Sequence, residues 1–268
     1  MKEFFGIGGY TRTPEGYLSW QHLTFVGSLL VLMVVLAVAL GRRNSLRTER
    51  EKNRVLIVSA LLIDGFELLK IVLACVAAGS AEALLYNLPL FLCSIQLIAL
   101  PLAAFSRGQV REAAVDFVCI FGILGAVFGT IGAGQNYNAY PVLSFDNVVS
   151  GITHSISGFA SLYIMFARMA GMKKRNIPWT FGILIAFCVL AYIVNITVGY
   201  NYMFLMAGDG TPYDIVYNLV GGSRLWYPLG VVGLFLAYIG LFYYVVFCLR
   251  RKKAKPCEQE SVAEEVHI

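Results

Sequence analysis

The sequence has too little charge for a protein that folds in water. Only 14% of its 268 residues are Asp, Glu, Lys or Arg, whereas 58% are hydrophobic. Soluble domains carry charge on about a quarter of their residues and do not sustain repeated apolar runs of about 20 residues. This composition excludes an ordinary soluble globule and a disordered chain, and it predicts a polytopic membrane protein.

The sequence also lacks the patterns that hold metals, cofactors or disulfide frameworks. Its six cysteines include no Cys-x-x-Cys pair and show no ordered spacing, which excludes a zinc site and a disulfide scaffold. It contains no glycine-rich phosphate-binding loop and no cluster of metal ligands. We therefore expect neither a metal nor a soluble cofactor.

Long apolar runs make up most of the sequence. Lipid offers no partner for backbone N–H and C=O groups, so such runs cross a membrane as helices unless they alternate like barrel strands, and these do not alternate. The predicted fold is all-α, with a seven-helix transmembrane domain over 19–249, a segment 1–18 before it and a tail 250–268 after it. The predicted helices cover residues 19–41, 55–79, 84–105, 112–133, 147–170, 177–199 and 227–249.

The basic residues predict how the chain is oriented. Most of the 21 Lys and Arg residues fall in the connections 42–54, 106–111 and 168–176 and in the tail after 249, all on one side of a seven-helix protein. Cytoplasmic loops carry such an excess, so we expect an outside N-terminus, a cytoplasmic C-terminus and a place in the plasma membrane, of the bacterial inner-membrane type. The net charge of +5 is then a topology signal, and a nucleic-acid partner is not expected.

Small residues and prolines predict how the helices pack. Gly122, Gly125, Gly129 and Gly132 are spaced by three and four residues, which lets a neighbouring helix approach closely. Pro101 predicts a kink in the third helix. Pro89 is expected to be tolerated, because the first turn of a helix needs no internal donor.

The second predicted helix carries three ionisable residues at spacings of three, Asp64, Glu67 and Lys70. This spacing places them along one side of the helix, where Glu67 and Lys70 can pair. A charge near the bilayer centre costs about 3 kcal/mol, so we expect the group to face the interior of the bundle. The group is either a structural ion pair or part of a functional site.

A histidine and a cysteine stand out in the third and fifth predicted helices. His154 is the only histidine deep in a span, and it continues a polar stripe formed by Ser150, Ser157 and Ser161. It is either hydrogen-bonded to a neighbouring helix or a catalytic base. Cys93 shares a helix face with Gln96, three residues on, and alone it would be a small buried apolar residue.

These polar groups come to similar depths. At a rise of about 1.5 Å per residue, Cys93, His154 and Lys70 each lie roughly 10–14 Å from the outer ends of their helices. They can therefore surround one cavity in the outer half of the membrane, with Asn195 shallower. A thiol becomes a nucleophile when an adjacent base removes its proton, and His154 is the only candidate base. The donors that could hold an oxyanion or support the site are Gln96, Asn87, Lys70, Glu67 and Asn195.

The outer segment 200–226 is long for a plain connection and rich in aromatic residues. We expect it to cover the cavity as a lid or interfacial helix rather than as a disordered connector. Its candidate substrate-facing residues are Asn201, Tyr202 and Phe204.

Several sequence elements resemble the YwaF-like integral membrane family of bacteria. They are Ser19-Trp20-Gln21-His22, Leu88-Pro89-Leu90-Phe91-Leu92-Cys93-Ser94, His154, Asn201-Tyr202-Met203-Phe204-Leu205 and Trp226-Tyr227-Pro228. That family is in turn similar to a eukaryotic transmembrane acyltransferase family that remodels ether phospholipids with a cysteine and a histidine. Cys93 and His154 match those two elements, so the resemblance implies lipid acyl chemistry at this pair.

Three functions follow from these features. The first is a lipid acyltransferase or acyl hydrolase that forms an acyl-cysteine, with a phospholipid or lysophospholipid of the membrane as substrate. The second is a transporter that uses Asp64, Glu67 and Lys70 as an ion relay, although the sequence shows no internal repeat. The third is a ligand-sensing seven-helix protein. A retinal protein is set aside, because 227–249 contains no lysine.

Overall fold

The protein is described by a computed structural model over residues 3–7 and 9–265, with side chains up to Arg251. Every regular element in this part of the chain is a helix, which confirms the all-α prediction. His267 and the side chain of Cys257 lie outside the described part. The longer helices are α1 (Trp20–Asn44), α2 (Glu49–Ala78), α4 (Gln96–Phe105), α5 (Gly108–Thr130), α7 (Phe145–Phe166), α8 (Ile177–Val198) and α10 (Trp226–Glu265). The shorter ones are α3 (Ala83–Tyr86), η1 (Leu92–Ile95), α6 (Gly134–Ala139), η2 (Lys174–Asn176), η3 (Tyr202–Phe204) and α9 (Asp214–Leu219).

Five helical stretches of the described chain are long and apolar enough to cross a membrane: Trp20–Asn44, Gly108–Ala139, Phe145–Phe166, Lys174–Val198 and Trp226–Arg251. They coincide with five of the seven predicted helices. The other two predictions fall on α2, whose apolar stretch contains three ionisable residues, and on the segment from α3 to α4. Seven crossings and their orientation stay predictions.

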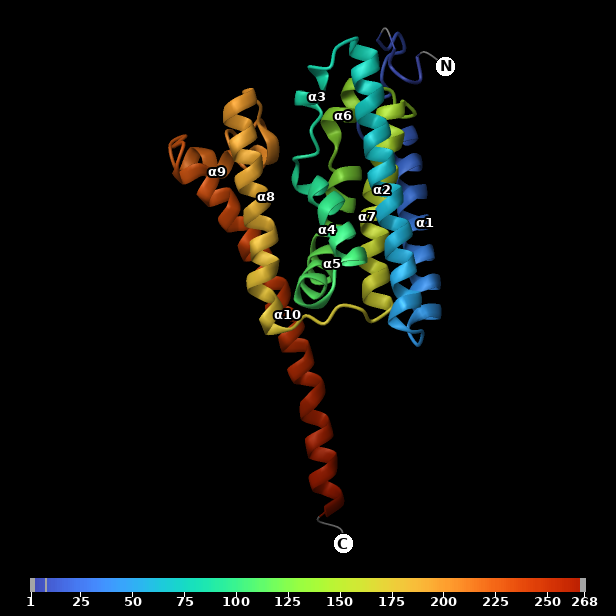
Figure 1. Cartoon of the computed structure of the whole chain (residues 1–268), viewed down its shortest axis with the longest axis vertical. Coiled ribbons are helices and arrows are strands. Elements are labelled where there is room, and N and C mark those ends of the chain that lie inside the picture. The colour runs from blue at the N-terminus through green and yellow to red at the C-terminus, as the bar shows by residue number, and fades with distance from the viewer. Residues whose placement is uncertain (1–2, 8, 266–268) are drawn as a thin grey trace.

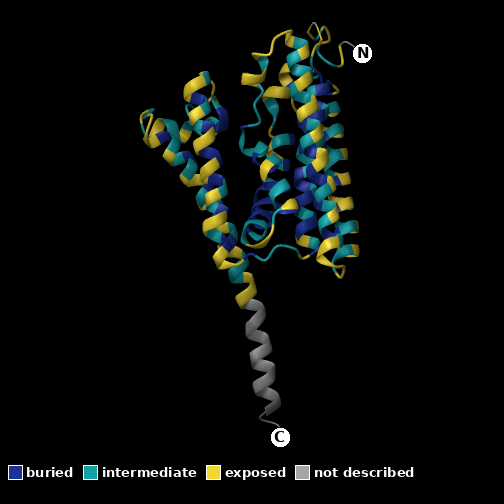
Figure 2. Ribbon diagram, in the orientation of Figure 1, coloured by how far each residue is buried: buried dark blue, intermediate teal, exposed yellow. Residues whose placement is uncertain are grey.

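The helices form two groups (Figure 1). In the first, α7 packs against α5, α1 and α2, and α4 packs against α5 and α2. In the second, α8, α9 and α10 lean away from this bundle (Figure 1). Figure 2 shows that buried residues concentrate where α4, α5 and α7 meet, while α1 and α2 expose their outer faces. The core of this junction is wholly buried and includes Phe117, Ile120 and Tyr163.

Local sequence explains where the helices begin and end. Ser19 caps α1 by accepting from the backbone N–H of His22. Thr48 and Glu51 form a reciprocal capping box at the start of α2. Helix α8 ends at Gly199, which adopts φ of 73°, a left-handed conformation that glycine takes without steric cost.

The third predicted helix is broken, and the prediction of one continuous helix over 84–105 is wrong. Helix α3 stops at Tyr86, residues 87–91 are not helical, and η1 leads into α4. Pro89 is the physical reason, because it cannot donate to Leu85 and it disfavours helical geometry at Leu88. We expected Pro89 to be accommodated in a first turn, but the chain is irregular around it.

A buried carboxylate links the two helix groups near the end where α5 and α8 begin. Asp116 of α5 accepts hydrogen bonds from the backbone N–H of Met172 at 3.1 Å, the amide of Asn176 at 2.7 Å and the hydroxyl of Tyr243 at 3.0 Å. Tyr243 also bonds Thr180 of α8 at 3.0 Å. This network anchors α8 and α10 to α5.

Candidate functional site

A cavity of about 350 Å³ lies within the first helix group, near the end where α7 begins. Its walls are formed by α2, α6, α7 and η1, and by the non-helical residues 87–91 between α3 and η1, which we call the broken segment. Tyr200, just after α8, completes the lining. Most of its polar lining residues are Glu67, Lys70, Asn87, Cys93, Ser94, Asp146, Ser150 and His154. The cavity therefore joins residues that are up to 137 positions apart in the sequence, from Ile63 to Tyr200.

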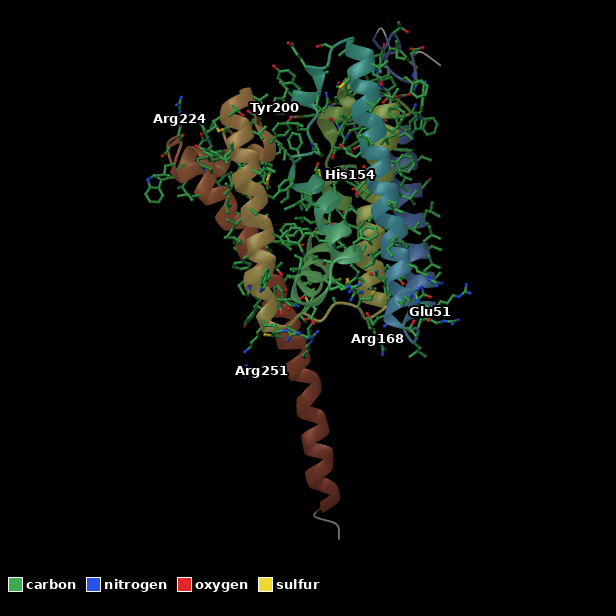
Figure 3. The ribbon with its side chains drawn as sticks, in the orientation of Figure 1. Glu51, His154, Arg168, Tyr200, Arg224 and Arg251 are labelled. Carbon is green, nitrogen blue, oxygen red and sulfur yellow. The ribbon has the colours of Figure 1, made fainter. Side chains whose placement is uncertain are left out.

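Cys93 and His154 lie next to each other in this cavity. Both are half-buried and both line it. The thiol of Cys93 and the imidazole of His154 are close enough to influence each other. Figure 3 shows His154 within the first helix group. The two residues that the sequence could place only at similar depths are neighbours.

The surroundings of His154 determine how its ring can act. Its Nδ1 lies 2.7 Å from the carbonyl oxygen of Ser150, one turn earlier on α7. A carbonyl only accepts, so Nδ1 carries the proton and donates it to this bond. In the neutral ring the other nitrogen, Nε2, then has a free lone pair. That nitrogen is the one available to accept a proton from the thiol.

Glycines of α5 make the close approach of these groups possible. A methyl group at Gly129 would overlap the ring of His154. One at Gly122 would meet the carbonyl oxygen of Ser157 at 2.6 Å, and one at Gly125 would lie 3.9 Å from Cβ of Cys93. Gly122, Gly125 and Gly129 thus pack α5 against α7, as predicted, and the last two also lie against the Cys–His pair. Gly132 lies after the end of α5 and meets Phe128 of its own segment instead of a neighbouring helix.

Glu67 and Lys70 form the ion pair that their spacing predicts, with 2.8 Å between Nζ and Oε1. Both line the cavity, so this ion pair shares it with the thiol and the imidazole. Asp64, one turn earlier, does not line the cavity, and its buried Oδ1 has no hydrogen-bond partner among the described residues. The three residues of the predicted relay are therefore not together at one site.

The predicted amide donors occupy different positions. Asn87 lines the cavity, and its Nδ2 donates to the carbonyl of Ala83 at 2.8 Å. Gln96 is 1% exposed and does not line the cavity, yet neither polar atom of its amide has a partner among the described residues. Asn195 is buried in α8 away from the cavity, where it holds the backbone of Tyr202.

The outer segment 200–226 is folded and contacts the broken segment. Tyr200 is its cavity-lining residue, whereas Asn201, Tyr202 and Phe204 do not line the cavity. Asn201 is used within the segment, where it donates to the carbonyl of Ala207 and accepts from the N–H of Met206, both at 2.8 Å. The ring of Phe204 lies 6.0 Å from that of Phe91.

With this geometry in view, comparison with known proteins is informative. The TMEM164 family model matches residues 17–243, which include four of the five spanning stretches, most of the fifth, and both Cys93 and His154. The chain belongs to the TMEM164 family. No curated protein and no solved structure matches it. Membership of this transmembrane family and the apolar helices together make the chain a membrane protein.

The TMEM164-family chain also lines its cavity with residues that we did not predict, namely Tyr86, Asn136, Tyr140, Asp146, Thr153 and Tyr200. One signal could have revealed Asp146, because the stripe of Ser150 and His154 continues back to it by a further four residues. Asp146 accepts from the hydroxyl of Tyr10 at 3.1 Å. Burial, followed by the charge of Asp146, raises the pKa of Tyr10 to about 12, so this hydroxyl stays a donor.

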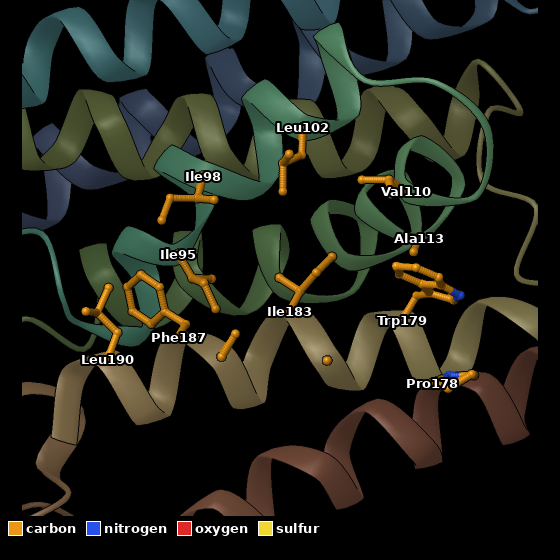
Figure 4. A pocket seen from close by; sticks show the side chains of 12 residues that line it. Ile95, Ile98, Leu102, Val110, Ala113, Pro178, Trp179, Ile183, Phe187 and Leu190 are labelled. Carbon is orange, nitrogen blue, oxygen red and sulfur yellow. The ribbon is translucent and has the colours of Figure 1, made fainter. Parts of the chain in front are cut away.

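A second hollow, of about 540 Å³, lies between α4, α5 and α8 (Figure 4). Its lining is apolar and includes Ile98, Leu102, Trp179 and Phe187. None of its lining residues is ionisable or nucleophilic, so it has no group for acid–base or covalent chemistry. Among the two hollows described for this TMEM164-family protein, the first cavity is the one with ionisable and nucleophilic lining residues.

Proposed function

We propose that this protein is a membrane-embedded lipid acyltransferase or acyl hydrolase, with Cys93 as nucleophile and His154 as general base. The observation that carries the proposal is that the thiol shares the cavity with a nearby imidazole whose Nδ1 is already committed to the carbonyl of Ser150. A thiol activated by an adjacent, oriented base is the arrangement used for covalent acyl chemistry.

The reaction begins when Nε2 of His154 takes the thiol proton and the sulfur of Cys93 attacks the ester carbonyl of a lipid. The carbonyl oxygen becomes an oxyanion. When the tetrahedral species collapses, the bond between the carbonyl carbon and the glycerol oxygen breaks, and His154 returns its proton to that oxygen. An acyl-cysteine and a lysolipid result. A lysolipid hydroxyl or water then attacks the thioester, with His154 again as base, and the thiol is restored.

Several groups around the pair can stabilise the charge that develops. Lys70 is the cation of the cavity, and Asn87 presents an amide there. Gln96 follows Cys93 by three residues, one turn of the intervening 3₁₀ segment, and its amide is uncommitted. Donors in a site shielded from water contribute most to oxyanion stabilisation. Glu67 orients Lys70 through their ion pair.

The membrane setting supports a phospholipid or lysophospholipid as the substrate. The sequence resembles the YwaF-like bacterial family and, through it, the acyltransferases that remodel ether phospholipids. Seven crossings are supported by the 30 residues of α2 and by the segment from α3 to α4 beside the five spanning stretches. With the basic excess on the cytoplasmic side, the cavity then lies in the outer half of the plasma membrane, and segment 200–226 covers it.

The test uses the purified protein in phosphatidylethanolamine–phosphatidylglycerol vesicles that contain a phospholipid with a radiolabelled acyl chain. Labelled free fatty acid reports hydrolysis, and labelled product formed on addition of an unlabelled lysophospholipid reports transfer. We expect Cys93→Ala and His154→Ala each to abolish both products, while Cys119→Ala, which changes a buried cysteine outside the cavity, retains them. Turnover that survives in both site variants contradicts the proposal.

A carrier is the second candidate, because the ion pair Glu67–Lys70 lines the cavity and the third helix is interrupted, as helices at transporter sites often are. Its signature is solute or proton flux across the vesicle membrane. Flux that is lost in Glu67→Gln but retained in Cys93→Ala favours the carrier. Lipid turnover that is lost in Cys93→Ala but retained in Glu67→Gln favours the enzyme.

A further inference from the structure

Pro89 breaks the third helix within the membrane-embedded part of the protein, and the break frees two backbone groups. In a continuous helix the carbonyl of Leu85 would accept from residue 89, but proline has no N–H. The N–H of Leu88 would donate to the carbonyl of Leu84, which instead accepts from Asn87 at 3.1 Å. Freed backbone groups in lipid must find partners elsewhere in the protein.

One side chain pairs with both freed groups. The hydroxyl of Tyr202 donates to the carbonyl of Leu85 at 2.7 Å and accepts from the N–H of Leu88 at 3.1 Å. Tyr202 is fully buried, and its ring lies 5.3 Å from that of Phe91, edge to face. Tyr202 therefore bonds both backbone groups that Pro89 leaves free. These groups lie shortly before the 3₁₀ turn that contains Cys93.

Tyr202 is itself held firmly from the other side. Asn195 of α8 donates to the carbonyl of Tyr202 at 2.9 Å and accepts from its N–H at 2.7 Å. Tyr202 thus links α8, in the second helix group, to the segment that precedes Cys93 in the first. Residues 87–91 lie outside the helices, and within the described chain their N–H groups bond to other backbone groups only in the turn contacts of Asn87 with Leu84 and of Leu90 with Leu88.

We infer that Tyr202 is a positioning residue for Cys93: its hydroxyl fixes the path of residues 87–91 so that the sulfur meets His154. The inference rests on the proposed function for the role of Cys93, and it gives the outer segment a task different from that of a lid. Tyr202 contacts backbone and neighbouring rings, and it does not line the cavity.

The test compares Tyr202→Phe with Tyr213→Phe in the full-length protein in vesicles. Phenylalanine keeps the ring against Phe91 and removes the bridging hydroxyl. Tyr213 provides the matched control, because it belongs to the same outer segment and packs against Phe204 without bonding the break. The rate at which methyl methanethiosulfonate modifies Cys93 is measured by peptide mass spectrometry across pH 5–9, with hydrogen exchange of peptide 84–92 alongside.

We expect Tyr202→Phe to slow the modification of Cys93 by about tenfold near neutral pH and to flatten its pH profile. Exchange in 84–92 should become faster, while Tyr213→Phe matches the parent in both measurements. A Cys93 profile unchanged by Tyr202→Phe overturns the inference. The proposed function has its own test in His154→Ala. It fails if this variant leaves Cys93 reactivity and lipid turnover unchanged, whatever the result for Tyr202→Phe.

A rescue variant separates positioning from simple stability. Pro89→Ala supplies an N–H that can bond the carbonyl of Leu85, so Pro89→Ala/Tyr202→Phe should recover the melting temperature lost in Tyr202→Phe. It should not recover Cys93 reactivity, because the segment then follows a helical path. If the double variant restores both, Tyr202 only stabilises the fold and the inference is overturned.

Discussion

Gly129 of α5 lies directly against the imidazole of His154, with no room for a Cβ between them. The ring is confined on this side by α5 and is held at Nδ1 by the carbonyl of Ser150. Two restraints on one imidazole leave few orientations open to it. The position of the ring can therefore be changed by a substitution at Gly129, without replacing either member of the Cys–His pair.

Gly129→Ala should therefore displace the imidazole and reduce lipid turnover by about 100-fold, because a misplacement of about 1 Å is enough for such a loss. The measurement is turnover in vesicles at equal amounts of folded protein. Gly125→Ala is the matched control, since its added methyl group would meet its nearest neighbours at ordinary contact distances of 3.7 to 4.0 Å. Equal activity in the two variants would show that the ring is not confined by α5.

Gln96 offers a prediction in which stability and activity move in opposite directions. Its amide is buried without a partner among the described residues, so replacing it with leucine removes an unpaired polar group. Gln96→Leu should stabilise the protein by about 1–3 kcal/mol and yet lower turnover, if the amide serves the oxyanion. Chemical unfolding and turnover are measured on the same preparation. Stabilisation with full activity would remove Gln96 from the site.

Asp116 should contribute to stability and not to chemistry. Asp116→Ala leaves three buried donors without their acceptor and should lower the free energy of unfolding by about 3 kcal/mol. Glu112→Ala, one turn earlier on α5, removes only the exposed ion pairs with Lys173 and Arg175 and should cost less than about 1 kcal/mol. Similar losses in the two variants would contradict the role of Asp116 as the anchor of α8 and α10.

The sequence predicts much of this fold because apolar run length is a strong signal. It also indicates Cys93, His154 and Lys70 through their similar depths, since an imidazole and an ammonium are uncommon in apolar helices and the thiol is the nucleophile at the same depth. It does not predict the break at Pro89. Proline in a first turn and proline that ends a helix look alike in one sequence, and the outcome depends on whether a partner exists for the carbonyl of Leu85. That partner is Tyr202, more than 100 residues away.

The same limit applies to individual side chains. The glycine spacing on α5 predicts close packing, but only the three-dimensional structure shows that Gly129 lies against His154. Asn195 and Asn201 have the chemistry of oxyanion donors, yet their hydrogen bonds are used to hold segment 200–209. The residue types in a sequence give the candidates for a site. Hydrogen bonds to the backbone then determine which of those side chains remain available to bind a substrate.

The most direct test of the account is to look for the acyl-cysteine itself. The protein is incubated briefly in phospholipid vesicles, quenched in acid, digested and analysed by mass spectrometry for a hydroxylamine-sensitive acyl group. The account predicts this thioester on the peptide that contains Cys93, and its loss in His154→Ala. An acyl group on another cysteine, or none on Cys93 while lipid turnover proceeds, would contradict it.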